Sequence, residues 1–186
     1  MTEKTLGEAF PDLLGAARTG ADWALTSLFR QYQPALLRYL RARAGDEAED
    51  LASDTWLCVA KSLGSFDGDE THFRRWLYTI AGRRLTDHLR RQSRRPSTAA
   101  TDDVLAAVPQ PGDTADEVVS AVAGDEAARR IARALSPGQA EVVLLRVVGG
   151  FSAEEVAAIT GRRAGTVRVL AHRGLARLAV EFSDGV

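Results

Sequence analysis

Hydrophobic residues recur at helical spacing along most of the chain after Ala21. A first run has the i, i+3, i+4, i+7 spacing of one helix face, and its members are Leu25, Leu28, Phe29 and Tyr32. Pro34 follows, either as a kink or as the first residue of a new helix that ends near Arg43. Residues 1–20 show little periodicity and contain Pro and Gly, so we predict a mobile or loosely docked arm there.

Two more helices are predicted before residue 95. Gly45 breaks the chain, and residues 46–63 then place apolar side chains on one face: Ala48, Leu51, Ala52, Thr55, Val59 and Leu63. Residues 65–71 are predicted to form a loop. The next helix has the apolar face Phe73, Trp76, Leu77, Ile80, Ala81, Leu85 and Leu89. Because Trp76 lies on that face, packing is favoured for it over base stacking.

Composition changes sharply after this third helix. Residues 96–128 contain no Lys or Arg and seven acidic residues, which predicts an acidic linker over 96–125. The linker is either irregular throughout or helical after Thr114. Helix resumes near Glu126, and the sequence Ser136-Pro137-Gly138-Gln139 favours the start of another helix. The fold class predicted is all-α, with two small helical domains.

The stretch 151–182 predicts a short helix, a tight turn and a longer helix. Ser152 and Glu155 have the spacing of a capping box, and Gly161 suits the left-handed turn that ends the short helix. The longer helix has the apolar positions Val167, Leu170, Ala171, Leu175 and Leu178. This order is typical of a helix-turn-helix, whose second helix enters the DNA major groove.

Charge is unevenly distributed, although the chain as a whole carries only −1. Residues 161–180 contain five Arg and no acid, and residues 72–95 contain eight Arg and one acid, Asp87. Helix-turn-helix patterns also occur in bundles that do not bind DNA, but such concentrated positive charge favours phosphate contacts. Glu47, Asp50 and Asp54 form an acidic ridge near Trp56, which by itself is typical of a solvated helix face.

Catalytic and metal chemistry finds little support in the sequence. His72, His88 and His172 lie far apart, and none has a Cys or carboxylate at metal-ligand spacing. We therefore expect no enzyme, no metal and no cofactor. The single Cys58 excludes an internal disulfide and fits a small, partly buried residue in a reducing compartment. With no long apolar run and no leader, a cytoplasmic protein is expected.

Five stretches in this order resemble the extracytoplasmic-function (ECF, group IV) sigma factors of the bacterial sigma-70 family. They are residues 28–40, 46–66, 73–95, 134–161 and 165–178. The resemblance implies an N-terminal arm (1–20), sigma region 2 (21–95), the linker (96–125) and sigma region 4 (126–186). It implies a factor that binds core RNA polymerase, recognises −35 and −10 promoter elements and promotes DNA melting.

The resemblance also assigns residues and partners. The implied polymerase-binding face is Glu47, Asp50, Asp54 and Trp56. The implied −10 contacts are Phe66, Asp67, Arg74, Arg75, Arg83, Arg84, Arg90 and Arg91. The implied −35 contacts are Arg162, Arg163, Thr166, Arg168, His172 and Arg173. The implied partners are the polymerase beta-prime clamp helices and beta flap, promoter DNA and an anti-sigma factor, with no small-molecule substrate.

Two other functions remain open at this point. A stand-alone helix-turn-helix regulator would bind duplex DNA as a dimer through the C-terminal helices. A nucleic-acid-processing enzyme would need a metal held by carboxylates such as Asp50, Asp54 and Asp87. Only the sigma-factor hypothesis requires both the acidic ridge and the basic helix within residues 73–95.

Overall fold

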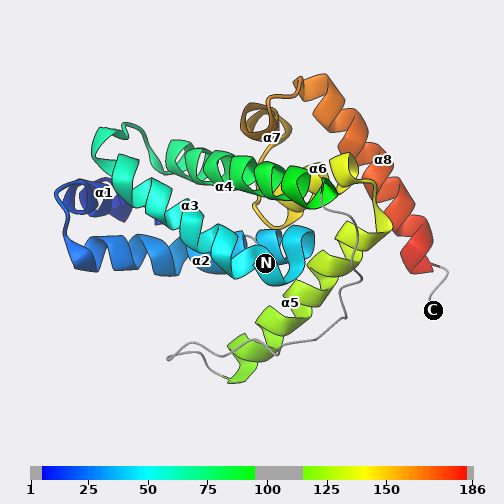
Figure 1. Cartoon of the computed structure of the whole chain (residues 1–186), viewed down its shortest axis with the longest axis horizontal. Helices are drawn as coiled ribbons and strands as arrows, with labels where there is room; N and C mark the ends of the chain where they lie inside the picture. The colour runs from blue at the N-terminus through cyan, green and yellow to red at the C-terminus, as the bar shows by residue number, and fades with distance from the viewer. Residues whose placement is uncertain (1–5, 95–114, 184–186) are drawn as a thin grey trace.

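The computed structural model describes residues 6–94 and 115–183. These residues form eight α-helices and three short 3₁₀ helices, and no strand occurs among them (Figure 1). The α-helices are α1 (Phe10–Arg18), α2 (Asp22–Ala44), α3 (Ala48–Ser62), α4 (Glu70–Ser93), α5 (Ala115–Ala134), α6 (Pro137–Val147), α7 (Ala153–Thr160) and α8 (Ala164–Ser183). The all-α class is confirmed, whereas most of the predicted linker lies outside the described residues.

The prediction of a loosely docked N-terminal arm is wrong for residues 6–20. Helix α1 buries four side chains at helical spacing: Phe10, Leu13, Leu14 and Ala17. Pro11 lies in the first turn, where its missing N–H is not needed, so it begins the helix instead of breaking it. The Phe10 ring lies against Phe73 of α4, with ring centroids 5.6 Å apart. The segment is therefore part of the hydrophobic core.

Helices α2, α3 and α4 pack on one another and, with α1, form the N-terminal unit (Figure 1). Helix α2 continues through Pro34 as one element of 23 residues, so the prediction that a new helix begins at Pro34 is wrong. Gly45 ends α2 at a φ of 60°, a conformation that favours glycine. The predicted inner face of α3 is buried at every position.

Helices α5 to α8 form the C-terminal unit. Both predicted capping boxes are present, at Ser136 with Gln139 and at Ser152 with Glu155. Gly161 adopts the left-handed conformation expected for the turn between α7 and α8.

The inner face predicted for α8 is wrong at one position. Leu175 is 50% exposed, and Gly174 takes the buried place. The core positions are Val167, Ala171, Gly174 and Leu178, which also fit helical spacing. A Cβ atom at Gly174 would lie 2.8 Å from Cγ2 of Val143, so the missing side chain allows α8 to approach α6. The spacing of hydrophobic residues in a sequence cannot show a contact that a glycine backbone makes.

The two units share one hydrophobic core instead of standing apart. Helix α5 packs against α2, and α7 packs against α4 (Figure 1). Phe151, between α6 and α7, is buried and lies edge-on to Tyr78 of α4, with ring centroids 4.9 Å apart. This arrangement brings the basic helix α4 next to the helix-turn-helix.

Candidate surfaces for polymerase and promoter DNA

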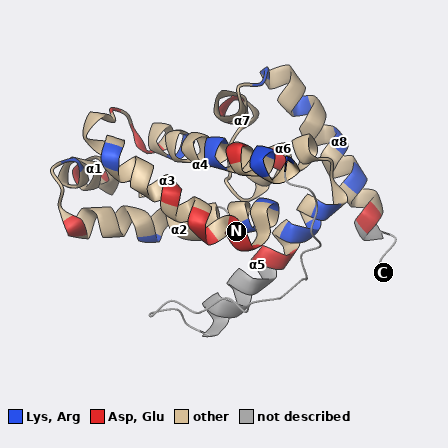
Figure 2. Ribbon diagram, in the orientation of Figure 1, with Lys and Arg blue, Asp and Glu red and all other residues tan. Residues whose placement is uncertain are grey.

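The acidic ridge lies along the exposed side of α3 and the 3₁₀ turn before it. Glu47, Asp50 and Asp54 are all exposed, and no ion pair within the described residues involves any of them. Glu49, on the same helix, pairs instead with Arg41 at 2.5 Å. Figure 2 shows acidic residues in red along α3. Because none of the ridge carboxylates forms an ion pair within the described residues, they remain available to a basic partner surface.

Trp56 does not share the face of the ridge. Its indole Nε1 donates a 2.7 Å hydrogen bond to Oε1 of Gln33 on α2. The centroid of its ring lies 5.3 Å from the centroid of the Phe29 ring. Trp56 and Phe29 line an apolar pocket of about 280 Å³ between α2 and α3, together with Leu25, Leu28 and Val59.

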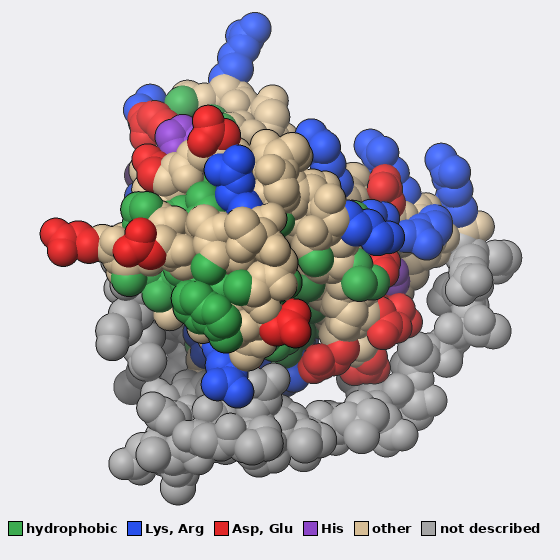
Figure 3. Space-filling model, turned by 90° about the vertical axis from the view of Figure 1, so that its left-hand side faces the viewer, with side chains coloured by type: hydrophobic (Ala, Val, Ile, Leu, Met, Phe, Trp, Pro, Cys, Tyr) green, Lys and Arg blue, Asp and Glu red, His purple; other side chains and the backbone are tan. Residues whose placement is uncertain are grey.

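Exposed apolar side chains occur on the same two helices as this pocket. Trp23 is 63% exposed on α2, and Leu57 is 57% exposed on α3. Figure 3 shows hydrophobic side chains gathered on the face of the molecule at the α1 end. Contiguous apolar surface of this kind marks interaction sites. The sequence signal was present, because both residues are apolar and lie outside the predicted core faces.

The loop of residues 66–69 places Phe66 against Trp76 of α4. The Phe66 ring stacks on Trp76, with centroids 4.9 Å apart and planes 25° apart, and both side chains are partly buried. Asp69 caps α4, because its Oδ1 accepts a 2.8 Å hydrogen bond from the backbone N–H of His72. That hydrogen bond holds the pKa of Asp69 below its ordinary value. Asp67, in the same loop, is exposed. An aromatic pair formed by a loop and the helix that follows it can receive an unstacked base.

Glu70 is a functional position that the sequence analysis missed. Its carboxylate accepts hydrogen bonds, each 2.8 Å long, from the backbone N–H groups of Leu6 and Gly7 and from the hydroxyl of Tyr32. One side chain thus joins the N-terminal segment, α2 and the start of α4 beside the loop. In the sequence, an acid in the first helical turn predicts only a favourable interaction with the helix dipole.

The arginines predicted to contact the −10 element differ in their surroundings. Arg74 donates a 2.6 Å hydrogen bond to the carbonyl oxygen of Gly149, and Arg84 donates one of 2.7 Å to Sγ of Cys58. Cys58 is partly buried, as predicted. Arg75 is partly buried, as Arg74 and Arg84 are. Arg83, Arg90 and Arg91 are exposed along α4.

A cleft of about 440 Å³ separates part of α4 from the helix-turn-helix. Arg83, Asp87 and Arg90 line it from α4, and Thr160 and Gly161 line it from the end of α7. Two of the predicted −10 residues therefore face the turn that precedes the predicted −35 helix. Figure 2 shows the basic residues of α4 and α8 in blue.

The helix-turn-helix presents an exposed face on α8. Arg163, Thr166, His172 and Arg173 are all exposed, the first just before the helix and the others along it. The remaining two candidates form ion pairs within the C-terminal unit, Arg162 with Glu141 at 2.9 Å and Arg168 with Glu154. These pairs are at least partly exposed, so phosphate can replace the carboxylates as the partner of each guanidinium.

The described residues contain no group of three or more His, Cys, Asp or Glu side chains placed to hold a metal ion. Nor does any helix in these residues combine the length and apolar character needed to cross a membrane.

Comparisons with known proteins agree with this architecture. Residues 28–95 match the family described as Sigma-70 region 2, and residues 125–178 match Sigma-70, region 4. The ECF RNA polymerase sigma factor BldN of Streptomyces coelicolor is 34% identical over 178 residues, which cover 93% of this chain and 66% of BldN. The RNA polymerase sigma factor CarQ of Myxococcus xanthus is 33% identical over 163 residues, covering 87% of this chain and 90% of CarQ. The ECF RNA polymerase sigma factor SigD of Mycobacterium tuberculosis is 31% identical over 192 residues, which cover 95% of this chain and 85% of SigD.

Solved structures show the same fold. The sigma factor RpoE in complex with the anti-sigma factor NepR, from Bartonella quintana, has a TM-score of 0.62 at 26% identity and covers 82% of this chain and 92% of that one. CnrH in complex with the cytosolic domain of CnrY has a TM-score of 0.65 at 22% identity. The match covers 96% of this chain and 100% of that one.

The chain therefore belongs to the sigma-70 family of transcription initiation factors. Within that family it is an ECF RNA polymerase sigma factor, a DNA-binding protein that acts with RNA polymerase. The two family matches together include the α3 ridge, the basic helix α4 and the helix-turn-helix. A stand-alone dimeric regulator would leave the first two without a role.

Proposed function

We propose that this sigma factor binds core RNA polymerase through the acidic ridge, and that Trp56, on another face of α3, contributes through the apolar pocket that it lines. The observation that carries this proposal is the exposure of Asp50 and Asp54 on one face of α3 without an ion pair among the described residues. Charged groups of this kind speed and orient association with an oppositely charged partner. The beta-prime clamp helices are the expected partner, and the beta flap is expected to meet the C-terminal unit.

We further propose that the two units read different promoter elements in the cytoplasm. Region 2 is assigned to residues 21–95 and region 4 to residues 126–186. Phe66 and the arginines of α4 bind the melted −10 strand, because aromatic rings and positive charge together suit single-stranded DNA. Arg163, Thr166, His172 and Arg173 read the −35 duplex, with Arg162 and Arg168 contacting phosphates. Extruding a base takes roughly a few kcal/mol, which these contacts must offset.

An anti-sigma factor is proposed as a further partner. The support is the solved complex of the sigma factor RpoE with the anti-sigma factor NepR, whose sigma chain shares this fold. The chemistry of the apolar pocket between α2 and α3 suits a hydrophobic helix from such a partner. No small-molecule substrate or catalytic step is proposed.

Polymerase binding is the experiment that tests the proposed function. Purified chain is titrated against core RNA polymerase, and Asp50→Arg/Asp54→Arg is compared with the wild type. The matched control is Glu8→Arg/Asp12→Arg, which makes the same charge change at exposed positions at and near the start of α1. We expect the ridge variant to weaken binding by about tenfold or more, with the control unchanged. Equal binding by all three proteins, each folded, would refute the assigned face.

A further inference from the structure

Val169 is an apolar residue in the middle of the exposed side of α8. Helix α8 lies at the edge of the molecule (Figure 1), and Val169 is 48% exposed there. It lies two positions from the buried Val167 and from the buried Ala171, which is about 200° around a helix from each. Its neighbours on the exposed side are three of the proposed −35 residues: Thr166, His172 and Arg173.

Gly165 lies one turn before Val169 on the same side of α8. It is exposed, and a Cβ atom there would meet no other part of the described structure within 4 Å. Its φ is not positive, so the backbone conformation does not require glycine either. Glycine also destabilises a helix relative to alanine. The Cα–Cβ bond of a helical residue tilts toward the N-terminus, so the side chain of Val169 leans toward this open surface.

The chemistry of valine limits what it can recognise in DNA. Base edges in the major groove present hydrogen-bond donors and acceptors, and the 5-methyl group of thymine is the apolar group among them. A valine pressed against an amino or carbonyl group would leave that group without a hydrogen bond, which is unfavourable. Single exposed valines are common on protein surfaces, but Val169 lies in the second turn of α8, in the part of a recognition helix that contacts bases. A thymine methyl group is therefore the partner that suits it.

The dimensions of the groove give the glycine a role. The major groove is about 12 Å wide, and a helix with its side chains is about 10–12 Å across. Because this fit is close, a side chain at position 165 would stand between α8 and the base edges that Val169 can reach. Glycine removes that obstacle, while His172 on one side of Val169 and Arg173 on the other keep polar contacts with the DNA.

We propose that Val169 and Gly165 make this sigma factor select a thymine within the −35 element. The side chain of Val169 contacts the 5-methyl group, and Gly165 leaves room for the approach. This inference rests on the proposed function, because it takes α8 as the −35 reader. It adds an apolar contact to a surface otherwise assigned to polar and charged side chains. Burying one methyl group favours binding by about fourfold, which sets the size of the selectivity.

The test removes the methyl group from the DNA and the side chain from the protein. Selection from randomised duplexes by the holoenzyme gives the preferred −35 element. Each thymine of that element, on either strand, is then replaced by deoxyuridine, which lacks only the methyl group. Competition fluorescence anisotropy measures the affinity of the holoenzyme for each duplex. We expect one replacement to weaken wild-type binding by about fourfold and to leave the binding of Val169→Ala unchanged.

The matched control is Val180→Ala, the same substitution on the same side of α8. Val180 is 63% exposed and follows Val169 by about three turns, beyond the part of the helix that reaches base edges. Both valines are exposed, so neither substitution removes core packing. Val180→Ala should keep the full response to deoxyuridine.

Gly165→Ala tests the room that the glycine leaves. We expect this variant to bind the unmodified −35 duplex several-fold more weakly than the wild type, although thermal unfolding shows it to be at least as stable. A role in folding alone would not separate binding from stability in this way.

Each result decides one part of the proposal. A preferred element without thymine, no response of the wild type to deoxyuridine, or the same response in Val169→Ala overturns the methyl contact. Loss of the response in Val180→Ala as well overturns its assignment to Val169. Wild-type affinity for Gly165→Ala overturns the role of the glycine. Failure of the proposed function is distinguishable, because Arg173→Ala would then also discriminate between −35 elements as the wild type does.

Discussion

Oε1 of Glu70 accepts a hydrogen bond of 2.8 Å from the hydroxyl of Tyr32, a residue 38 positions earlier in the chain. The same carboxylate binds the N–H groups of Leu6 and Gly7. Glu70→Ala removes all three hydrogen bonds, so we expect the free energy of unfolding to fall by about 2 kcal/mol. Urea denaturation followed by circular dichroism measures it. Thr71→Ala, at an exposed neighbour, should change it by less than about 0.5 kcal/mol, and equal effects would contradict this role.

Two glycines of α8 provide a matched pair for the packing of the helix-turn-helix. A Cβ atom at Gly174 would meet Val143 at 2.8 Å, whereas one at Gly165 would meet nothing within 4 Å. We expect Gly174→Ala to lower the free energy of unfolding by about 1–3 kcal/mol through overpacking. Gly165→Ala should leave it unchanged or raise it by up to about 1 kcal/mol, since Ala favours helix. Thermal unfolding compares the two variants, and the opposite order would disprove the assigned packing.

Arg173 is expected to read bases, and Arg177 to contact at most the DNA backbone. Both are exposed on α8, but Arg177 lies a turn further from the N-terminal part that reaches base edges. Arg173→Ala should reduce discrimination between an intact and an altered −35 element by about 1–3 kcal/mol. Arg177→Ala should preserve the discrimination. Holoenzyme binding to the two promoters measures both, and equal discrimination by wild type and Arg173→Ala would remove Arg173 from the contact surface.

The stacked pair of Phe66 and Trp76 is expected to act at the melting step. Phe66→Ala should slow open-complex formation by roughly tenfold, because base stacking on an aromatic side chain contributes about 1–3 kcal/mol. A template with a pre-melted −10 bubble should restore most of the rate, since melting is then already complete. Permanganate reactivity of unpaired thymines follows opening, with Ser65→Ala as the exposed control. A defect of the same size on both templates would assign Phe66 to a different step.

Local features of the fold were predictable from the sequence because their causes are local. The capping box of Ser152 and Glu155 depends on residues three apart, and the turn at Gly161 depends on one glycine. The exposed ridge follows from the helical period of Glu47, Asp50 and Asp54. In each case the interacting groups lie within one helix or its immediate ends, so spacing alone defines them.

Features that depend on contacts between distant segments were not predictable in this way. Helical periodicity shows which face of a helix is buried, but it does not show which helix covers that face. The contacts of Glu70 with Tyr32 and of Asp125 with Arg38 join residues 38 and 87 positions apart. The apolar spacing of Phe10, Leu13, Leu14 and Ala17 is present in the sequence, but the Pro and Gly within residues 1–20 favoured a mobile or loosely docked arm there.

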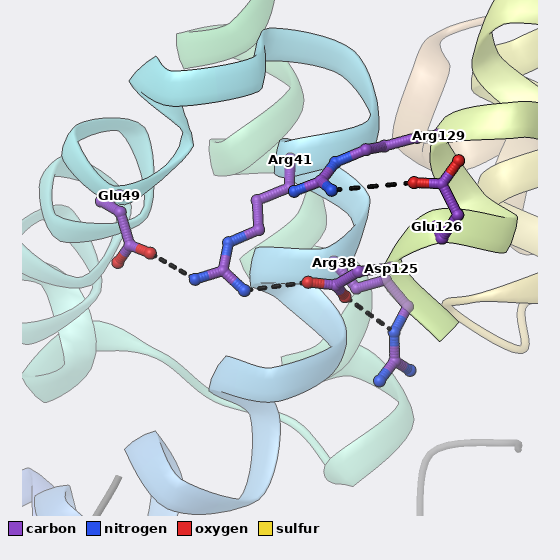
Figure 4. A network of polar contacts seen from close by, with 6 residues as sticks. All are labelled: Arg38, Arg41, Glu49, Asp125, Glu126 and Arg129. Carbon is purple, nitrogen blue, oxygen red and sulfur yellow. Dashed lines mark hydrogen bonds and ion pairs between the residues drawn. The ribbon is translucent and has the colours of Figure 1, made fainter. Parts of the chain in front are cut away.

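Helix α2 joins the apolar pocket between α2 and α3 to the contact with α5. At 1.5 Å per residue its 23 residues extend about 35 Å. Its early turns carry Leu25 and Phe29 of the apolar pocket, and its late turns carry Arg38 and Arg41, which bind Asp125 (Figure 4). If α2 moves as a rigid body, a tilt of about 10° at one end displaces the other by roughly 6 Å. A partner that levers α2 at the pocket would therefore pull on the ion pairs that hold α5.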